Sequence, residues 1–182
     1  NDGSDAAGSY GWYGSNAYGS DAARSYGWYG PNAHGGDAAG SYLFDMLGRF
    51  DLASGTYQDD GDDDIRLHGT RITNVVRCLP PENKPVAAEV NACRAFLKAE
   101  IKAMPKLDTI LTLGRVAHDS TCRTLGLRPA EVPFGHGHCW HGEAGGRPMR
   151  IVSSYHCSRY NTQTGRLTDE MFADVFRLAT KG

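Results

Sequence analysis

The sequence predicts an α/β domain whose sheet is mostly parallel and covered by helices on both faces. Two observations predict this class. Strand-like runs alternate with helix-like runs along the chain, which is the pattern of successive strand–helix units. The apolar run at residues 107–113 (LDTILTL) also has the character of a buried strand, as expected in a sheet with helices on both faces.

Composition is that of an ordinary globular domain. The chain has 182 residues, of which 40% are hydrophobic and 22% charged. Its formal net charge of -2 gives no general attraction for nucleic acid, so a DNA-binding function would need a local basic face. No apolar run approaches the roughly 20 residues that span a bilayer, and no signal-peptide pattern opens the chain. We therefore expect a cytoplasmic, monomeric protein that does not enter membranes.

The first 36 residues differ from the rest. Residues 4–19 and 20–35 are two copies of a sixteen-residue repeat, and a third copy begins at Gly36. The repeat is rich in glycine and has no apolar periodicity, so we expect residues 1–36 to be poorly ordered. A duplication or a misread gene would explain them. The globular domain is expected over residues 37–182.

The first elements of that domain follow from spacing and from proline. Residues 38–51 carry apolar side chains at helical intervals and predict an amphipathic helix. Residues 71–76 (RITNVV) are β-branched and predict a strand that ends before Pro80. Pro85 stands at the start of the next predicted helix, where its missing N–H costs nothing, and Pro105 ends that helix.

The remaining elements complete the alternation. Residues 107–113 predict a strand, 115–125 a helix and 149–153 a further strand, which is followed by a polar loop at 156–166. Thr168 is the expected N-cap of the last helix. Ligands in parallel sheets bind beyond the carboxyl ends of strands, and the loops after the first and last predicted strands leave at those ends.

Two long segments carry a family resemblance. Residues 72–85 (ITNVVRCLPPENKP) and 154–168 (SYHCSRYNTQTGRLT) closely resemble motifs of the family 5 uracil-DNA glycosylases. Residues 87–97 continue the match, and Asp37 is similar to the aspartate that enters the family's first conserved helix. The resemblance implies a three-layer α/β/α fold with a central four-stranded, mostly parallel sheet. It also implies hydrolysis of the N-glycosidic bond of uracil, and often of other deaminated bases, in DNA during base excision repair.

The resemblance also implies three catalytic residues. Asp37 would orient or activate water and offset positive charge on the sugar, and Asn74 would hydrogen-bond the extruded base or the water. His156 would donate a hydrogen bond to the negative charge that develops on the base. Each residue has a simpler alternative. Asp37 could instead be the N-cap of the following helix. Asn74 could be a polar turn residue whose hydrogen bonds are satisfied within the protein, and His156 could be a loop residue without a role in the reaction.

The segment after His156 is implied to contact DNA. By resemblance, Ser158, Arg159, Tyr160 and Asn161 would enter the minor groove and fill the gap left by the extruded base. Arg159 and Arg166 would also pair with phosphates, which position a protein without reading sequence. The alternative is a solvated basic loop.

A [4Fe–4S] cluster is implied by the family, but its ligand set is incomplete here. Such a cluster needs four thiolates in the usual case. Cys78 and Cys93 match two ligands, whereas the other two should precede Asp37, and residues 1–77 contain no cysteine. We therefore expect an N-terminal part that is truncated or rearranged. The other thiols stand where the family places no ligand: Cys122, Cys139 and Cys157.

Two rival hypotheses remain open at this point. The family's first motif shapes the base pocket, and here His34 stands where its stacking phenylalanine belongs, so the chain could be a DNA-binding relic without activity. Alternatively, the segment 134–142 (FGHGHCWHG) could bind zinc, although structural zinc sites usually draw ligands from two separated pairs. Its potential ligands are His136, His138, Cys139 and His141.

Overall fold

The computed structural model describes residues 11–15, 38–57, 64–76 and 86–181. The helices are α1 (Ala38–Arg49), α2 (Ala87–Ala103), α3 (Arg115–Thr124), α4 (Arg159–Gln163) and α5 (Asp169–Thr180). The strands are β1 (Gly11–Ser15), β2 (Ala53–Ser54), β3 (Arg66–Leu67), β4 (Thr70–Asn74), β5 (Thr109–Leu113), β6 (Cys139–Ala144) and β7 (Arg147–Ser154).

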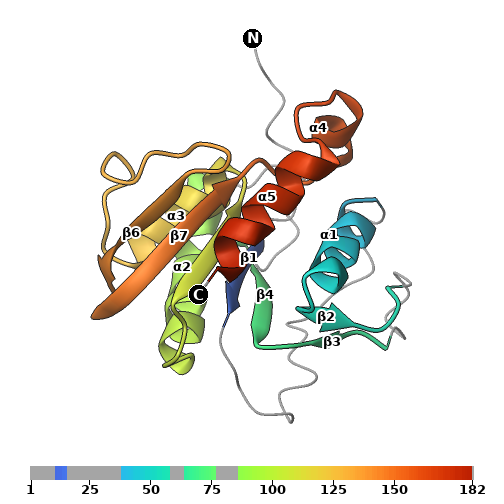
Figure 1. The fold of residues 1–182 in the computed structure, drawn as a ribbon. Helices are drawn as coiled ribbons and strands as arrows, with labels where there is room; N and C mark the ends of the chain where they lie inside the picture. The colour runs from blue at the N-terminus through green and yellow to red at the C-terminus, as the bar shows by residue number, and fades with distance from the viewer. Residues whose placement is uncertain (1–10, 16–37, 58–63, 77–85, 182) are drawn as a thin grey trace.

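The main sheet has the strand order β4-β1-β5-β7-β6 (Figure 1). Strands β5 and β7 are parallel, whereas β1 is antiparallel to both of its neighbours, β4 and β5. It follows that β4, β5 and β7 all run in the same direction, as the alternation of strands and helices predicts. Their carboxyl ends therefore meet at one edge of the sheet.

Helices cover both faces of the sheet, so the predicted three-layer α/β arrangement is confirmed. Neighbouring residues of a strand point to opposite faces. On β5, Leu111 and Leu113 join the cluster that contains α1 and α5 residues, whereas Ile110 joins the cluster that contains α2 and α3 residues. Every residue of β5 is buried, which agrees with a strand between two helical layers.

The expected four-stranded, mostly parallel sheet needs correction, because the described sheet has five strands and is mixed. Two of the five strands were not predicted from spacing, and both are antiparallel to their neighbours. One is β1, from the first repeat copy, and the other is β6, which overlaps the FGHGHCWHG segment. Ala144 pairs with Arg147, so Gly145 and Gly146 form a two-residue hairpin loop. Both have positive φ, 61° and 78°, which glycine adopts readily.

The repeat region is described only where it forms β1. Residues 1–10 and 16–37 lie outside the described residues, so the expected lack of order over residues 1–36 stays a prediction. The boundary between the repeats and the domain also stays a prediction. Among the described residues, no helix is long and apolar enough to cross a membrane.

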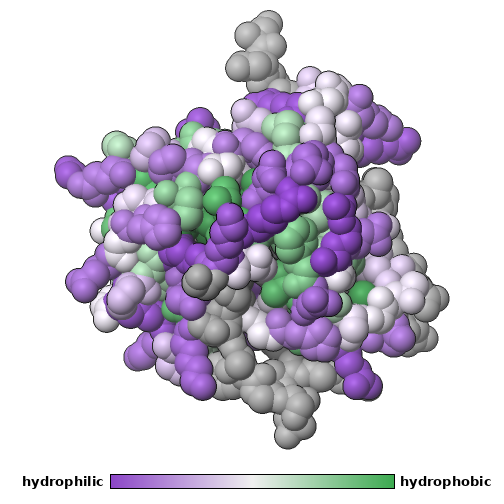
Figure 2. Space-filling view, viewed as in Figure 1, coloured by the Kyte–Doolittle hydropathy of each residue, from purple (hydrophilic) through white to green (hydrophobic). Residues whose placement is uncertain are grey.

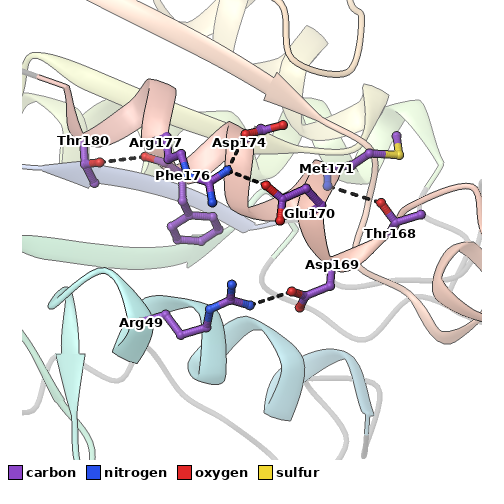
Figure 3. Close-up of polar contacts among 9 residues, drawn as sticks. All are labelled: Arg49, Thr168, Asp169, Glu170, Met171, Asp174, Phe176, Arg177 and Thr180. Carbon is purple, nitrogen blue, oxygen red and sulfur yellow. Dashed lines mark hydrogen bonds and ion pairs between the residues drawn. The ribbon is translucent and has the colours of Figure 1, made fainter.

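Helices α1 and α5 pack through aromatic residues beneath a charged surface. Phe172 and Phe176 are fully buried, and Phe50 stacks on Phe176 with 5.4 Å between ring centroids. At the surface, Arg49 of α1 pairs with Asp169 of α5 at 2.7 Å (Figure 3). Figure 2 shows this face as mostly hydrophilic, with patches of hydrophobic residues between. Because exposed ion pairs contribute little, the buried rings carry most of this contact.

Candidate active site

Asn74 and His156 lie at the same edge of the sheet. Residues that pair with one another form a row across β4, β1, β5 and β7. On β4, Asn74 is the residue after the row. Beyond β7, His156 is the third residue after the row. Since neighbouring strands are about 4.8 Å apart, the two strand ends are separated by three spacings, or about 14 Å. The row consists of Thr73, Trp12, Thr112 and Ser153.

A clip within the loop after β7 holds the backbone at His156. The Asn161 side-chain amide donates to the His156 carbonyl at 2.9 Å, and the Asn161 carbonyl accepts from the Leu167 N–H at 2.9 Å. Ser158 caps the short helix α4, because its hydroxyl oxygen accepts from the Asn161 N–H at 3.5 Å. The structure thus places Asn161, expected at the DNA, inside the protein with only 2% of its surface exposed.

The other expected DNA-contacting side chains are on the surface. Arg159 and Arg166 are exposed, and Tyr160 has an exposed fraction of 52%. The Arg166 guanidinium lies 4.8 Å from the centre of the Tyr155 ring, a cation–π distance that supports its orientation. On the neighbouring strand end, Arg115 lies 4.9 Å from the ring centre of Phe134. The edge therefore carries exposed cations beside aromatic rings, although the chain has no net positive charge.

A buried histidine that the sequence did not single out lies under this edge. The His118 Nε2–H donates to the Val132 carbonyl at 2.7 Å, which leaves Nδ1 to accept from the Ser153 hydroxyl at 2.9 Å. Burial lowers the pKa of His118. The sequence feature that could have indicated a buried histidine was its position between Ala117 and Cys122, which lie on the buried side of the same helix. His118 ties the segment after α3 to the end of β7.

Acidification is expected to destabilise the fold through His118. Its folded-state pKa lies below the unfolded value of 6.5, so the unfolded state binds more protons. Stability should therefore be complete above about pH 6.5 and fall as pH decreases, by at most about 1.4 kcal/mol per pH unit for this one group. Urea unfolding between pH 5 and 8 measures this slope. His118→Gln should reduce the slope and the exposed-site control His68→Gln should not; equal slopes in all three proteins would contradict the assignment.

The [4Fe–4S] cluster that the family implies has no complete ligand set among the described residues. Cys93 is buried on α2 and packs in a cluster with Val75 and Val76, close in sequence to Cys78. Cys78 and Asp37 lie outside the described residues. Burial raises the pKa of Cys122 to about 11 and that of Cys157 to about 12. Both thiols are buried among apolar side chains, where they pack as small hydrophobic residues.

The zinc hypothesis also lacks a ligand cluster. No three or more His, Cys, Asp or Glu side chains in the described part of the chain are arranged to hold a metal ion. Within the FGHGHCWHG segment, Cys139 Sγ lies 3.2 Å from His141 Nε2, but His136 points to the end of β7, where its Nδ1 lies 3.3 Å from the Tyr155 N.

Comparison with known proteins agrees with the fold. The model of the uracil DNA glycosylase superfamily matches residues 29–179, and the chain belongs to this superfamily. Within it, the chain is similar to the type-5 uracil-DNA glycosylase of Thermus thermophilus, with 40% identity over 140 residues, which are 77% of this chain and 62% of the relative. The type-5 enzyme of Pyrobaculum aerophilum is 35% identical over 137 residues, 75% of this chain and 58% of the relative.

The match to the type-4 branch is shorter. The type-4 uracil-DNA glycosylase of Pyrobaculum aerophilum is 31% identical over 93 residues, 50% of this chain and 47% of that protein. The predicted membership of the superfamily is confirmed, and the type-5 relatives match more of the chain than the type-4 relative does. The chain spans between 52% and 62% of the length of the type-5 relatives that it matches, so it corresponds to a part of those proteins.

Proposed function

We propose that this chain hydrolyses the N-glycosidic bond of uracil, and of other deaminated bases, in DNA during base excision repair. The observation that carries the proposal is the placement of Asn74 and His156 at the ends of parallel strands on one edge of the sheet. A base extruded from the duplex at a cost of a few kcal/mol would fit between them. The sequence resemblance and the type-5 relatives support the same chemistry.

The proposed reaction separates charge between base and sugar. As the bond breaks, negative charge grows on the uracil and positive charge grows on the sugar. His156 would donate a hydrogen bond to the base, and Asn74 would hold the base or the attacking water. Asp37 would orient that water and offset the charge on the sugar. The clip from Asn161 to the His156 carbonyl would keep the imidazole in place, so Asn161 acts as a positioning residue rather than as a DNA contact.

The proposed partner is DNA that contains uracil or another deaminated base. Arg159 and Arg166 would pair with phosphates, while Ser158 and Tyr160 would lie at the minor groove. A single chain carries the proposed residues, which fits a monomer, and the proposed compartment is the cytoplasm. The cluster of the family would take Cys78 and Cys93, with two further ligands that residues 1–77 do not supply.

A single-turnover excision assay tests the proposal. The full chain is mixed with a labelled duplex that contains one uracil, and abasic sites are cleaved with alkali. We expect a single product from the uracil duplex and none from a matched duplex with thymine at that position. The alternative, a DNA-binding relic, predicts salt-dependent binding with no product and indifference to His156→Ala. That result would reject the proposed activity.

Arg166→Ala is expected to weaken DNA binding about equally on all sequences. One phosphate contact contributes roughly one unit to the slope of log Kobs against log salt concentration, so the slope should decrease by about 1. Fluorescence anisotropy from low to moderate salt measures it. Arg128→Ala is the matched control, because Arg128 is exposed and pairs with Glu131 on the segment after α3. An unchanged slope in Arg166→Ala would remove Arg166 from the interface.

A further inference from the structure

The FGHGH turn, left unexplained by metal binding, is attached to the end of β7. The Gly137 N–H donates to the Ser153 carbonyl at 2.8 Å, and the Ser153 N–H donates to the His138 carbonyl at 2.9 Å. Gly137 has a φ of +73°, a conformation that favours glycine. The turn thus extends the pairing between β6 and β7 and presents the side chain of His136 to the residues that follow β7.

His136 holds the first backbone group beyond the strand. Strand β7 ends at Ser154, whose carbonyl accepts the Gly114 N–H at 2.8 Å. The next N–H, that of Tyr155, donates to His136 Nδ1 at 3.3 Å. The His136 ring also stacks on the Tyr155 ring, with 5.0 Å between centroids and an interplanar angle of 24°. A side chain therefore supplies the acceptor where the strand pairing stops.

The neutral form of His136 suits this role. Burial is the largest influence on this ring and lowers its pKa, while a hydrogen bond to the Met171 backbone and the charge of Asp174 act in the opposite direction. A neutral ring that carries its hydrogen on the other nitrogen keeps the Nδ1 lone pair available for the Tyr155 N–H. His136 thus lies between the end of β7 and Met171 in the first turn of α5.

His156 is held by side chains on both sides along the chain. On the N-terminal side, His136 binds the N–H of Tyr155, one residue before His156. On the C-terminal side, the Asn161 amide binds the His156 carbonyl at 2.9 Å. Without these two bonds, the loop that leaves the strand would have fewer constraints on the direction of the imidazole.

We infer that His136 is a positioning residue for His156, acting by fixing the backbone between β7 and the catalytic loop. The inference rests on the proposed function, since it takes uracil excision as the reaction that His156 assists. A misplacement of a catalytic group by about 1 Å is enough to slow a reaction by about 100-fold. His136 therefore affects the rate of the chemical step without touching the base.

Two substitutions at His136 distinguish the effect of its hydrogen-bond acceptor from the effect of its aromatic ring. His136→Phe keeps an aromatic ring for Tyr155 but removes the acceptor, and we expect single-turnover excision to slow by about 10- to 100-fold with the Kd for DNA unchanged. His136→Asn places an oxygen near the position of Nδ1 and should recover most of the lost rate. His141→Phe, on the exposed side of β6, is the matched control and should retain the wild-type rate.

A second measurement does not depend on activity. In 15N-histidine-labelled full-length protein without DNA, the His156 ring signals should shift in His136→Phe, return toward wild type in His136→Asn and stay unchanged in His141→Phe. A wild-type protein that leaves uracil in place would reject the proposed function, while the spectra would still test the backbone clamp. An active wild type with equal rates in His136→Phe, or unshifted His156 signals in that variant, would overturn the inference. So would a loss confined to DNA affinity.

Discussion

His156→Ala is expected to slow single-turnover uracil excision by about 100- to 1000-fold, the usual effect of removing one hydrogen-bond donor from developing negative charge. His156 follows β7 at the edge of the sheet that also carries Asn74. Its backbone carbonyl accepts a hydrogen bond from the Asn161 side-chain amide at 2.9 Å. The backbone that would carry the proposed donor is therefore anchored in the protein without DNA. Water that replaces the ring would have to be ordered during the reaction, which raises the barrier.

The rate should be measured at saturating protein on a uracil-containing duplex, so that weaker binding does not enter it. His141→Ala removes an exposed imidazole elsewhere on the sheet and serves as the control with an expected wild-type rate. A loss of less than about tenfold in His156→Ala would be too small for a donor to the leaving base. It would favour the alternative of a bystander histidine.

Phe176→Ala is expected to lower the free energy of unfolding by about 3–5 kcal/mol, as is usual for a phenylalanine truncated in a core. Phe176 is fully buried. Its ring stacks on Phe50 of α1 at 5.4 Å and meets Phe172 edge-to-face at 5.2 Å. Truncation would remove the ring contacts with Phe50 and Phe172. It would also leave a cavity that the two helices cannot close without losing their other contacts.

Equilibrium urea unfolding followed by circular dichroism measures this change. Phe96→Ala is the matched control, because Phe96 has an exposed fraction of 50% on α2, and its truncation should alter stability by no more than about 0.5 kcal/mol. If Phe176→Ala cost less than about 1 kcal/mol, the packing of α5 against α1 would be wrong.

The helices could be predicted because their signals are local. Helix α1 begins where the apolar spacing begins, and α2 lies between Pro85 and Pro105, as expected. The predicted N-cap of α5 is confirmed, since the Thr168 hydroxyl oxygen accepts from the Met171 N–H at 3.2 Å. Each of these features depends on residues within one or two turns, so composition and spacing determine them.

The two strands that the sequence did not predict were missed for different reasons. β1 has the sequence GWYGS, with no polar alternation to mark a strand, and its pairing partners Thr70–Asn74 and residues 109–112 lie far along the chain. β6 was obscured by a run of glycine and histidine that resembles a metal-binding turn. The pairing of β1 is thus between distant segments, whereas β6 pairs with β7, which follows it after two glycines.

The candidate site could be located but not oriented from the sequence. Strand direction was enough to bring Asn74 and His156 to one edge. The inward turn of Asn161 was not predicted, because a polar residue in a polar loop is usually exposed. Its direction is determined by the His156 carbonyl, which needs a donor once the strand has ended. His118 was missed for a similar reason, since its partners, Val132 and Ser153, come from two separate segments.

A crystal structure of the full chain with DNA that carries a non-hydrolysable uracil nucleotide would test the central claim most directly. We expect one extruded uracil at the carboxyl edge of the sheet, with polar atoms of Asn74 and His156 both within about 3.2 Å of that ring or of its attacking water. A uracil bound elsewhere, or one that meets neither side chain, would contradict the account.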